Sequence, residues 1–464
     1  MQLVAYGAQD IYLSGNPQIT FFKIIYRRHT NFAMESIEQV FNGQADWGKK
    51  VTATVSRNGD LVSRVFLRVT LPDVSVAPGK GFRWLNWIGH TMIDYVEVEI
   101  GGQRIDRHYG DWLHIWAELT QTAGHQLGYA NMVGNTPSLT TPTLNTGASA
   151  VTVKGQVLWI PLEFWFCRNP GLALPLIALQ YHEVKINLSL NPATACYWSG
   201  VAPVAPSTTW TTDMTAVNAT NNLSLTTCSL FIDYVYLDTD ERRRFAQAAH
   251  EYLIEQLQFT GAESTTQSPY KARLNLNHPV REIIWVVQPT DLVTDGDPNA
   301  PKYGKQWFNY TDSADTSYDI LNQNLTEAGA MPGVAAGGAN NVFLPTNFDG
   351  GENPTSECKL QLNGHDRFSQ RDGRYFNLVV PYMCHENVPS KGINVFSFAL
   401  KPEELQPSGS CNMSRIDNAT LTLYLTDKTI RLGGNTRTAS VRIYAVNYNV
   451  LRIMSGMGGL AYSN

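Results

Sequence analysis

Three observations predict an all-β chain of two similar antiparallel domains in tandem, each a sandwich or a barrel. A stretch of the first half recurs about 218 residues later, many short segments alternate apolar and polar residues, and few segments have helical periodicity. Alternating strands separated by Gly, Pro and Asn turns are typical of antiparallel sheets. The 464 residues give room for roughly two or three domains of ordinary size.

The recurrence relates residues 41–72 to residues 259–289. Phe41 and Gly43 match Phe259 and Gly261, and after a one-residue gap four further residues match: Asn58 with Asn275, Arg64 with Arg281, Val69 with Val286, and Pro72 with Pro289. Solenoid repeats have periods of roughly 20–50 residues, so a period this long indicates a duplicated domain. Each copy later contains a strand that runs into a tight turn, at residues 99–104 and 361–367.

The strands are predicted from a period of two. Each of four segments places its apolar side chains on one face of a half-buried strand. The apolar residues are Val51, Ala53 and Val55; Val96, Val98 and Ile100; Val184, Ile186, Leu188 and Leu190; and Ala419, Leu421, Leu423 and Leu425.

Two short helices are predicted. Trp112, Ile115, Trp116 and Leu119 follow Asp111 at helical spacing, which indicates an amphipathic helix. A second helix at residues 238–246, capped by Thr239 or Asp240, falls where the first domain gives way to the second. We therefore predict an N-terminal arm at 1–32, a first domain at 33–240, a linker at 241–250 and a second domain at 251–464.

Three segments, 121–154, 191–227 and 290–357, are rich in Thr, Asn, Gly and Pro, and they are predicted to be long loops. Such loops usually carry surface contacts. The third lies between the two parts of the second copy, because Gly102 and Gly364 are 262 residues apart.

Composition excludes several function classes. Charged residues make up 16% of the chain and the net charge is −5, so no basic field favours binding to nucleic acid or to an anionic membrane.

The longest apolar stretch, at 171–179, is too short to span a membrane. No secretory signal precedes Gly7, so we expect synthesis in the cytosol. The six cysteines are widely spaced and are predicted to be free thiols.

No catalytic, cofactor-binding or metal-binding residues are predicted. The pairs His182-Glu183, His250-Glu251 and His385-Glu386 lack the second histidine of a helical zinc motif, and no phosphate-binding or nucleophile motif is present. These absences favour a structural protein over an enzyme. Two alternatives stay open: a glycan-binding β-sandwich that uses Tyr303, Trp307 and Phe308, and a metal-dependent enzyme of the cupin type.

Seven Asn-x-Ser/Thr sequences occur, and four of them lie in the predicted loops. We take Asn218, Asn222, Asn309 and Asn324 as candidate glycosylation sites.

Residues 7–32 form the most distinctive segment, which includes Gly15-Asn16-Pro17 and the basic residues of 23–29. This segment resembles the N-terminus of the major capsid proteins of nucleocytoplasmic large DNA viruses, of the phycodnavirus and marseillevirus type. The resemblance continues through residues 100–106, 170–184, 250–259, 415–419 and 448–460. It is absent from the three predicted loops.

The resemblance implies two tandem eight-stranded antiparallel jelly rolls and a structural role in the virion. Three chains would form a capsomer of pseudo-sixfold outline, assembled in the host cytoplasm, that tiles an icosahedral shell around an inner membrane and a DNA core. Its partners would be neighbouring capsomers and minor capsid, cement and penton proteins, with the inner membrane contacted indirectly and no sequence-specific nucleic acid. The predicted loops would top towers of unequal height and meet the host surface or glycans.

The resemblance also implies a role for the arm on the inner side of the shell, in contact with minor capsid proteins. The arm residues expected to make this contact are Gln18, Phe21, Phe22, Lys23, Arg27 and Arg28.

Overall fold

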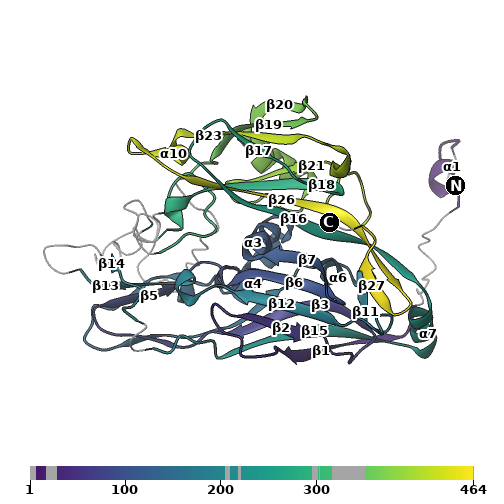
Figure 1. Ribbon diagram of the computed structural model, residues 1–464, viewed down its shortest axis with the longest axis horizontal. Coiled ribbons are helices and arrows are strands. Elements are labelled where there is room, and N and C mark those ends of the chain that lie inside the picture. Colours follow the sequence, from purple (N-terminus) through teal and green to yellow (C-terminus); the bar gives the residue numbers. More distant parts are fainter. Residues whose placement is uncertain are drawn as a thin grey trace, which may run out of the picture.

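The computed structural model describes residues 7–16, 29–203, 210–217, 221–294, 301, 304–315 and 351–462. Two jelly rolls follow one another along the chain, and Figure 1 shows the first beneath the second. Each has two four-stranded antiparallel sheets at its centre, which confirms the predicted fold class.

The first jelly roll contains residues of 32–237. Its first sheet has the order β1 (Phe32–Val40), β15 (Thr227–Leu237), β3 (Leu61–Thr70) and β10 (Val157–Pro161), with β11 (Leu174–Pro175) beside β3. Its second sheet has the order β2 (Lys50–Thr54), β12 (Val184–Leu190), β6 (Ile93–Ile100) and β7 (Gln103–Tyr109).

The second jelly roll repeats both strand orders with residues of 250–460. Its first sheet is β16 (His250–Thr265), β26 (Ala439–Met454), β18 (Pro279–Pro289) and β21 (Ile393–Ser397), extended by β22 (Cys411–Asn412) and β27 (Met457–Leu460). Its second sheet is β17 (Tyr270–Arg273), β23 (Ala419–Leu425), β19 (Thr355–Leu362) and β20 (His365–Asp372). Eight strands in one copy therefore have eight counterparts in the other.

The duplication is confirmed at the level of topology, but the gap in its alignment is wrong. Val286 pairs with Arg442 and faces the first jelly roll, whereas its predicted match Val69 faces its own core. A shift of one residue turns a strand residue to the opposite face of the sheet. Without the gap, Val69 corresponds to Val287.

The predicted tight turns are confirmed in both copies. Gly101 and Gly102 between β6 and β7 have φ of 57° and 85°, and Asn363 and Gly364 between β19 and β20 have φ of 51° and 80°. Two successive residues with positive φ form the two-residue turn that matches the twist of a hairpin.

Both predicted helices are present. The first is α3 (Gly110–Thr120), and the second is α7 (Thr239–Gln247) between the jelly rolls. The cap of α7 was predicted one or two residues late, since the Asp238 carboxylate accepts from the Thr239 backbone N–H at 2.7 Å. In the described part of the chain, α4 (Ala123–Val133) is as long as α3, and the other α-helices are short: α1 (Ile11–Ser14), α2 (Ile88–Thr91), α5 (Pro137–Thr140), α6 (Trp165–Arg168), α9 (Val380–Cys384) and α10 (Asp427–Ile430).

Further turns of 3₁₀-helix are η1 (Pro170–Leu172), η2 (Ala193–Ala195), η3 (Thr290–Leu292) and η5 (Met413–Arg415). A π-helical turn, η4 (Tyr375–Val379), leads directly into α9.

Two of the predicted long loops are wrong in part. Residues 121–154 contain α4, α5, β8 (Thr143–Leu144) and β9 (Val151–Val153), because Tyr129, Val133 and Leu139 are buried among the polar residues. Residues 191–227 contain β13 (Tyr197–Val201) and β14 (Thr211–Thr212), which join β5 (Lys80–Trp84) and β8 in a third sheet. Two-stranded pairs complete the fold: β4 (Val74–Val76) with β9, and β24 (Arg431–Leu432) with β25 (Asn435–Thr436).

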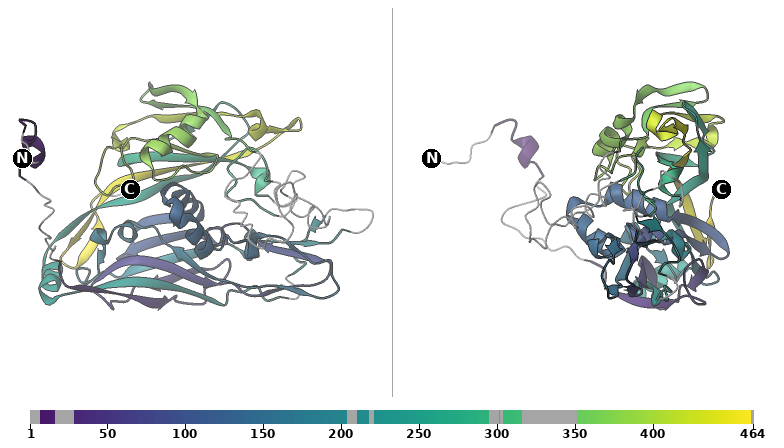
Figure 2. Two further views of the ribbon diagram at one scale, coloured as in Figure 1. Left: turned by 180° about the vertical axis from the view of Figure 1, so that it is seen from behind. Right: turned by 90° about the vertical axis from the view of Figure 1, so that its left-hand side faces the viewer.

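Helix α3 lies between the two jelly rolls in Figures 1 and 2. One connected cluster of buried apolar side chains runs through both jelly rolls and includes Trp112 of α3 and Tyr444 of β26. The two halves therefore share a packed contact. All six cysteines are free, as predicted.

A glycine starts the helix that follows the last strand of the second sheet in each copy. A Cβ at Gly110 would lie 2.3 Å from the His90 carbonyl oxygen and 2.5 Å from that of Ile93, at the start of β6. A Cβ at Gly373 would lie 1.9 Å from the carbonyl oxygen of Thr355, at the start of β19. Both helices thus rest on equivalent strands through a residue without a side chain.

We expect Gly110→Ala and Gly373→Ala each to lower the free energy of unfolding by roughly 1–3 kcal/mol, because backbone must move to admit the methyl group. The matched control is Gly128→Ala in α4, where a Cβ meets no atom within 4 Å and alanine favours the helix. Denaturant unfolding followed by circular dichroism measures all three. Equal midpoints for the three variants would contradict the close contacts.

Candidate functional site

The contact between the two jelly rolls is built on α3. Asp111 forms an ion pair with Arg442 of β26, and the Trp112 ring lies 5.6 Å from that of Tyr444, also of β26. The Trp116 ring lies 4.0 Å from the guanidinium of Arg168, at the end of α6, and 5.7 Å from that of Arg281, in β18. One face of α3 therefore packs against the first sheet of the second jelly roll through charged and aromatic contacts.

The two arginines beside Trp116 share one carboxylate. Arg168 lies 2.8 Å from Glu255 of β16, and Arg281 forms an ion pair with the other oxygen of the same carboxylate. The side chain of Arg281 is 1% exposed and that of Glu255 is 13% exposed. Since Arg168 belongs to the first jelly roll, Glu255 bridges the two halves with both of its oxygens.

The buried charges continue on both sides of this bridge. Glu163 lies 3.9 Å from Arg168. On the other side, Glu282 lies 3.3 Å from Arg281 and 3.1 Å from His385. Burial raises the pKa of Glu163, although Arg168 opposes this shift. Burial alone would lower the pKa of Arg281, but Glu255 and Glu282 raise it.

His385, at the end of α9, closes this chain of alternating charges. Its other ring nitrogen lies 2.7 Å from Glu403. Burial alone would lower the pKa of His385, but the carboxylates of Glu282 and Glu403 raise it to about 9. Burial likewise opposes ionisation of Glu282, yet His385 and Arg281 bring its pKa below the usual value. An imidazolium between two carboxylates is the state that this geometry stabilises.

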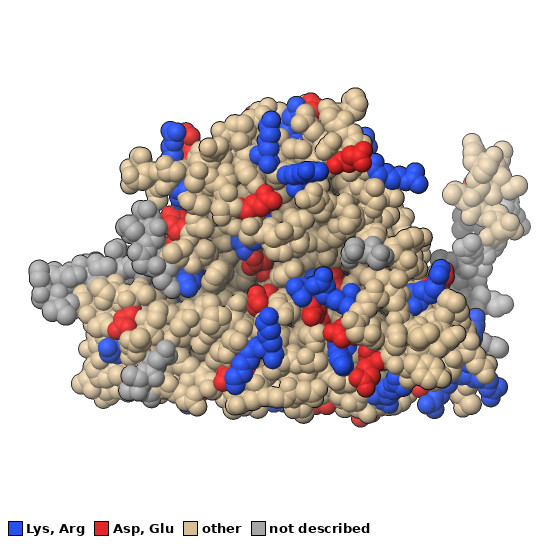
Figure 3. Space-filling view, in the orientation of Figure 1, with Lys and Arg blue, Asp and Glu red and all other residues tan. Residues whose placement is uncertain are grey.

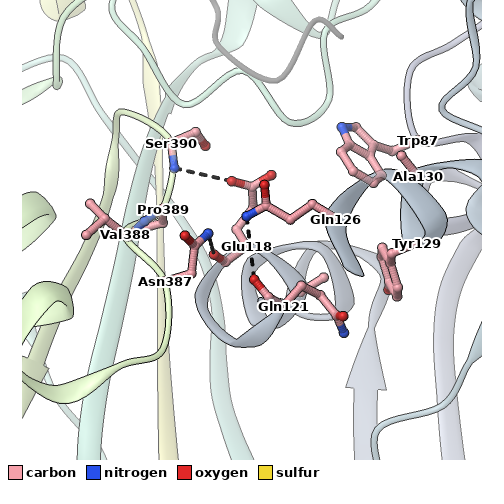
Figure 4. A pocket seen from close by; sticks show the side chains of 11 residues that line it. Trp87, Glu118, Gln121, Gln126, Tyr129, Ala130, Asn387, Val388, Pro389 and Ser390 are labelled. Atoms are coloured by element: carbon pink, nitrogen blue, oxygen red, sulfur yellow. Dashed lines mark hydrogen bonds between the residues drawn. The ribbon is translucent and has the colours of Figure 1, made fainter. Parts of the chain in front are cut away.

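A cavity of about 230 Å³ lies beside this contact and is lined by polar and apolar residues of both jelly rolls. In Figure 4, Glu118 of α3 points toward Ser390, whose backbone N–H donates to the carboxylate at 3.3 Å. The side-chain amide of Asn387 donates to the Glu118 carbonyl oxygen at 2.9 Å. Burial raises the pKa of Glu118 to about 7, against the effect of Ser390. Glu118 is the one carboxyl group among the residues that line this cavity.

Histidines at this contact serve as neutral packing groups. The His114 ring lies 4.3 Å from the Phe308 ring, and His90 donates to or accepts from the Tyr129 hydroxyl at 2.8 Å. Burial lowers the pKa of His90 to about 3 and also lowers that of His114. Within the described residues, no group of three or more His, Cys, Asp or Glu side chains is placed to hold a metal ion.

The aromatic residues suggested for glycan binding do not form an exposed platform. Phe308 is buried, and the Trp307 indole N–H donates to the Ala195 carbonyl oxygen at 2.7 Å. Both residues pack between the two jelly rolls, so the prediction of an aromatic sugar site there is wrong. Tyr303 lies outside the described residues.

One of the candidate glycosylation sites is wrong for a physical reason. Asn309 is fully buried, and its side-chain amide donates to Gln306 and to the Ser313 carbonyl oxygen while its oxygen accepts from Thr311. Asn222 is exposed and stays a candidate. Asn218 and Asn324 lie outside the described residues, as does most of the third predicted loop.

All six arm residues singled out from the sequence, from Gln18 to Arg28, also lie outside the described residues. The described part of the arm contains α1, whose Ile11, Tyr12 and Leu13 are 69–89% exposed. Among the described residues no helix is long and apolar enough to cross a membrane.

Apolar side chains are also exposed on both jelly rolls. They include Phe32, Met34 and Val40 of β1, and Leu378, Val379, Tyr382 and Met383 of the helical segment formed by η4 and α9. Figure 3 shows a face on which most side chains are uncharged and several charged ones gather around the recess between the two jelly rolls. Such exposed apolar groups mark surfaces for association.

Comparisons with known proteins agree with this architecture. The family described as "Major capsid protein N-terminus" matches residues 20–238, and the family described as "Large eukaryotic DNA virus major capsid protein" matches residues 241–459. The chain belongs to the major capsid proteins of large eukaryotic DNA viruses.

Relatives cover the whole chain. It is 52% identical to the major capsid protein of Phaeocystis pouchetii virus and 41% identical to that of Paramecium bursaria Chlorella virus 1, in each case over 100% of this chain and 99% of the relative. The solved "PBCV-1 virus capsid, quasi-atomic model" has a TM-score of 0.70 and 37% identity, and covers 96% of this chain and 100% of that one. The Faustovirus major capsid protein, at 13% identity and a TM-score of 0.68, shows the same fold.

Membership of this structural family gives the function: this chain is a major capsid protein that forms an icosahedral viral capsid. The family is a capsid family without known enzymatic activity, and the alternative of a glycan-binding β-sandwich is not supported.

The charged contact was not predicted from the sequence. Glu255, Arg168 and Arg281 lie far apart in the sequence, and no local pattern joins them. The helix of η4 and α9 was also missed, although Tyr375, Leu378, Val379 and Tyr382 have the spacing i, i+3, i+4 and i+7. That spacing was a usable signal, but Pro381 interrupts it.

We expect Glu255→Gln to lower the free energy of unfolding by roughly 3–5 kcal/mol, because the buried Arg281 and the partly buried Arg168 lose their shared carboxylate. Glu251→Gln is the matched control on the same strand, since its ion pair with Arg452 is exposed and such pairs contribute roughly 0–1 kcal/mol. Denaturant titration of the two variants measures the difference. A similar, small effect of both substitutions would contradict the bridging role of Glu255.

The raised pKa of His385 predicts a pH dependence of stability. Folding raises the pKa of His385 from the ordinary 6.5 to about 9. The protonated imidazole therefore stabilises the fold fully below pH 6.5, and this stabilisation is lost as the pH rises through about 9. We expect His385→Gln to be less stable than the native chain at low pH, with the gap closing above pH 9.

Unfolding midpoints between about pH 6 and pH 10 measure this gap. His365→Gln, on the exposed side of β20, is the control. Parallel pH profiles for the native chain and His385→Gln would rule out the buried imidazolium.

Proposed function

We propose that three copies of this chain form a capsomer of pseudo-sixfold outline. The observation that carries the proposal is the duplication: both halves have the same eight strands in the same order, and one packed contact holds them together. Three chains with two similar jelly rolls each supply six similar units, which suits a hexagonal position in a closed shell. The role of the chain in the shell is structural, without catalysis.

Low charge and exposed apolar groups support a surface that partners cover. Charged residues are 16% of the sequence, against roughly 25% in soluble domains generally. We infer that capsomers meet neighbouring capsomers and minor capsid, cement and penton proteins, and that assembly takes place in the host cytoplasm. The outer loops would meet the host surface or glycans, and the inner membrane would be reached through other proteins.

We assign the arm to the inner face of the shell, where Gln18, Phe21, Phe22, Lys23, Arg27 and Arg28 would contact minor capsid proteins. The exposed Ile11, Tyr12 and Leu13 of α1 support a docking role, because monomeric soluble proteins rarely leave adjacent apolar side chains uncovered.

Asn218, Asn222 and Asn324 remain proposed glycosylation sites. Peptide mass spectrometry of the virion protein tests them directly, and unmodified peptides at all three positions would remove them.

We expect the purified chain to sediment with three times the 51.6 kDa mass of one chain and to give hexagonal outlines in negative-stain microscopy. A chain without residues 1–28 should form the same particle, since the arm is assigned to contacts beyond the capsomer, but should no longer bind the minor capsid proteins of the same virus. Sedimentation as a single chain would refute the capsomer. Loss of trimers on deleting the arm would refute its assignment.

A further inference from the structure

We propose that the exposed face of the helix formed by η4 and α9 docks on the outer face of the first sheet of a second copy of this chain. That outer face carries Phe66, Arg68, Trp159 and Phe231. The proposal rests on the capsomer proposed above and names the two surfaces through which its chains meet. It follows from a contact that the chain already makes within itself.

The two helices are equivalent parts of the two jelly rolls. Helix α3 follows β7 and precedes β10, and the helical segment from Gly373 through α9 follows β20 and precedes β21. Gly110 and Gly373, which are 263 residues apart, seat them on the first residues of β6 and β19. These strands hold the same position in the same sheet order.

The same stripe of side chains lies along both helices. In α3 the stripe is Asp111, Trp112, Ile115, Trp116 and Leu119, and positions 263 residues later are Arg374, Tyr375, Leu378, Val379 and Tyr382. This spacing places the five side chains of α3 on one side of an α-helix. In the second segment, which includes the π-helical turn η4, Arg374, Leu378, Val379 and Tyr382 are exposed, whereas Phe376, Asn377 and Val380 are buried. The four apolar members in α3 are at most 5% exposed, whereas Leu378, Val379 and Tyr382 are 45%, 43% and 80% exposed.

The outer faces of the first sheets of the two jelly rolls also differ in exposure. In the second jelly roll, Ile284, Val286 and Tyr444 face α3 and are at most 1% exposed. Ile284 pairs with Tyr444 as Phe66 pairs with Phe231, so Phe66 and Phe231 are the counterparts in the first jelly roll.

These counterparts are left partly exposed in the single chain. The Trp159 ring lies 4.8 Å from that of Phe231, and Arg68 lies over both rings. At the edge of this face, Met34 and Val40 of β1 are 50% and 74% exposed. The contact made once inside the chain is therefore present a second time as two uncovered halves.

The charges agree with this assignment. The ion pair of Asp111 with Arg442 anchors the first turn of α3. Arg374 takes the place of Asp111, lies 3.9 Å from Glu352 of its own jelly roll and keeps 73% of its side chain exposed, so an acidic group on the receiving sheet would give it a second partner. Glu38 of β1 lies on the outer face, opposite Phe231 and 3.9 Å from Arg68, and 47% of its side chain is still exposed.

The occupant must be a second copy. The outer face of the first sheet, at β1 and β15, lies on the side of the first jelly roll away from the second, while η4 and α9 belong to the second (Figures 1 and 2). The helix of one chain therefore cannot reach its own first sheet. If each chain makes this contact with the next, every helix face and every outer sheet face is covered only when the chains form a closed ring.

The first measurement compares Leu378→Asp with Leu127→Asp in full-length chains by sedimentation. Both residues are helical leucines, 45% and 48% exposed, but Leu127 lies in α4 outside the stripe. We expect Leu378→Asp to weaken trimer formation roughly tenfold or more, and Leu127→Asp to leave it unchanged. Circular dichroism checks that both variants fold.

The second measurement places a photo-reactive phenylalanine at position 379 and identifies crosslinked peptides by mass spectrometry. We expect intermolecular crosslinks to the peptides that contain Phe66, Trp159 or Phe231. Trimers with crosslinks only to other surfaces, or trimers that persist in Leu378→Asp, would overturn this interface while leaving the proposed capsomer intact. A native chain that sediments as a monomer would overturn both.

Discussion

The carboxylate of Glu255, shared between Arg168 and Arg281, is the interaction on which the arrangement of this chain depends. Arg168 comes from the first jelly roll, and both other groups come from the second. Glu255 and Arg281 pair within the second jelly roll, but Arg168 gains its nearest carboxylate, at 2.8 Å, only across the contact, because Glu163 of its own half lies 3.9 Å away. Loss of the partner of a buried ion costs several kcal/mol. Trp116 lies beside both guanidinium groups and fixes where α3 sits. The two jelly rolls thus have one favourable placement, and the partially exposed surfaces of the chain take their positions from it.

The strands could be predicted from the sequence better than the contact between the two jelly rolls, because a strand pattern involves neighbouring residues and the contact involves distant ones. Val184 to Leu190 and Ala419 to Leu425 alternate strictly, and both became strands with the expected buried face. Period-two burial is a local signal. The bridge of Glu255 depends on residues brought together only by the complete fold. Even the duplication, which was visible from Phe41 and Phe259, was misaligned by one residue at Val69, because a few identities do not fix which face a strand residue occupies.

Polar composition misled the prediction of loops. Residues 121–154 contain many Thr, Asn and Gly residues, yet α4 forms there because Tyr129 and Val133 pack into the core. Tertiary burial outweighs weak local preference. Asn309 shows that polar composition also misled the prediction of surface exposure. Its segment has the composition of a surface loop, but the structure buries it, and its side-chain amide donates to the Gln306 side chain and to the Ser313 carbonyl oxygen, where no enzyme reaches it.

The covered and uncovered versions of the helix contact differ in chemistry, and the difference follows from the physics of association. Within one chain, the linker keeps the two halves at high effective concentration, so the contact tolerates a buried network whose charges lose much of their hydration. Between chains, association also costs translational and rotational freedom. Apolar side chains such as Leu378, Val379 and Tyr382 suit that task, because their burial gives net affinity without unpaired charges. The exchange of Asp111 for Arg374 also distinguishes the two contacts, because Arg374 would meet the like charge of Arg442 on the sheet that pairs with Asp111. Duplication supplied two copies of one docking geometry, and this divergence assigns one to folding and the other to assembly.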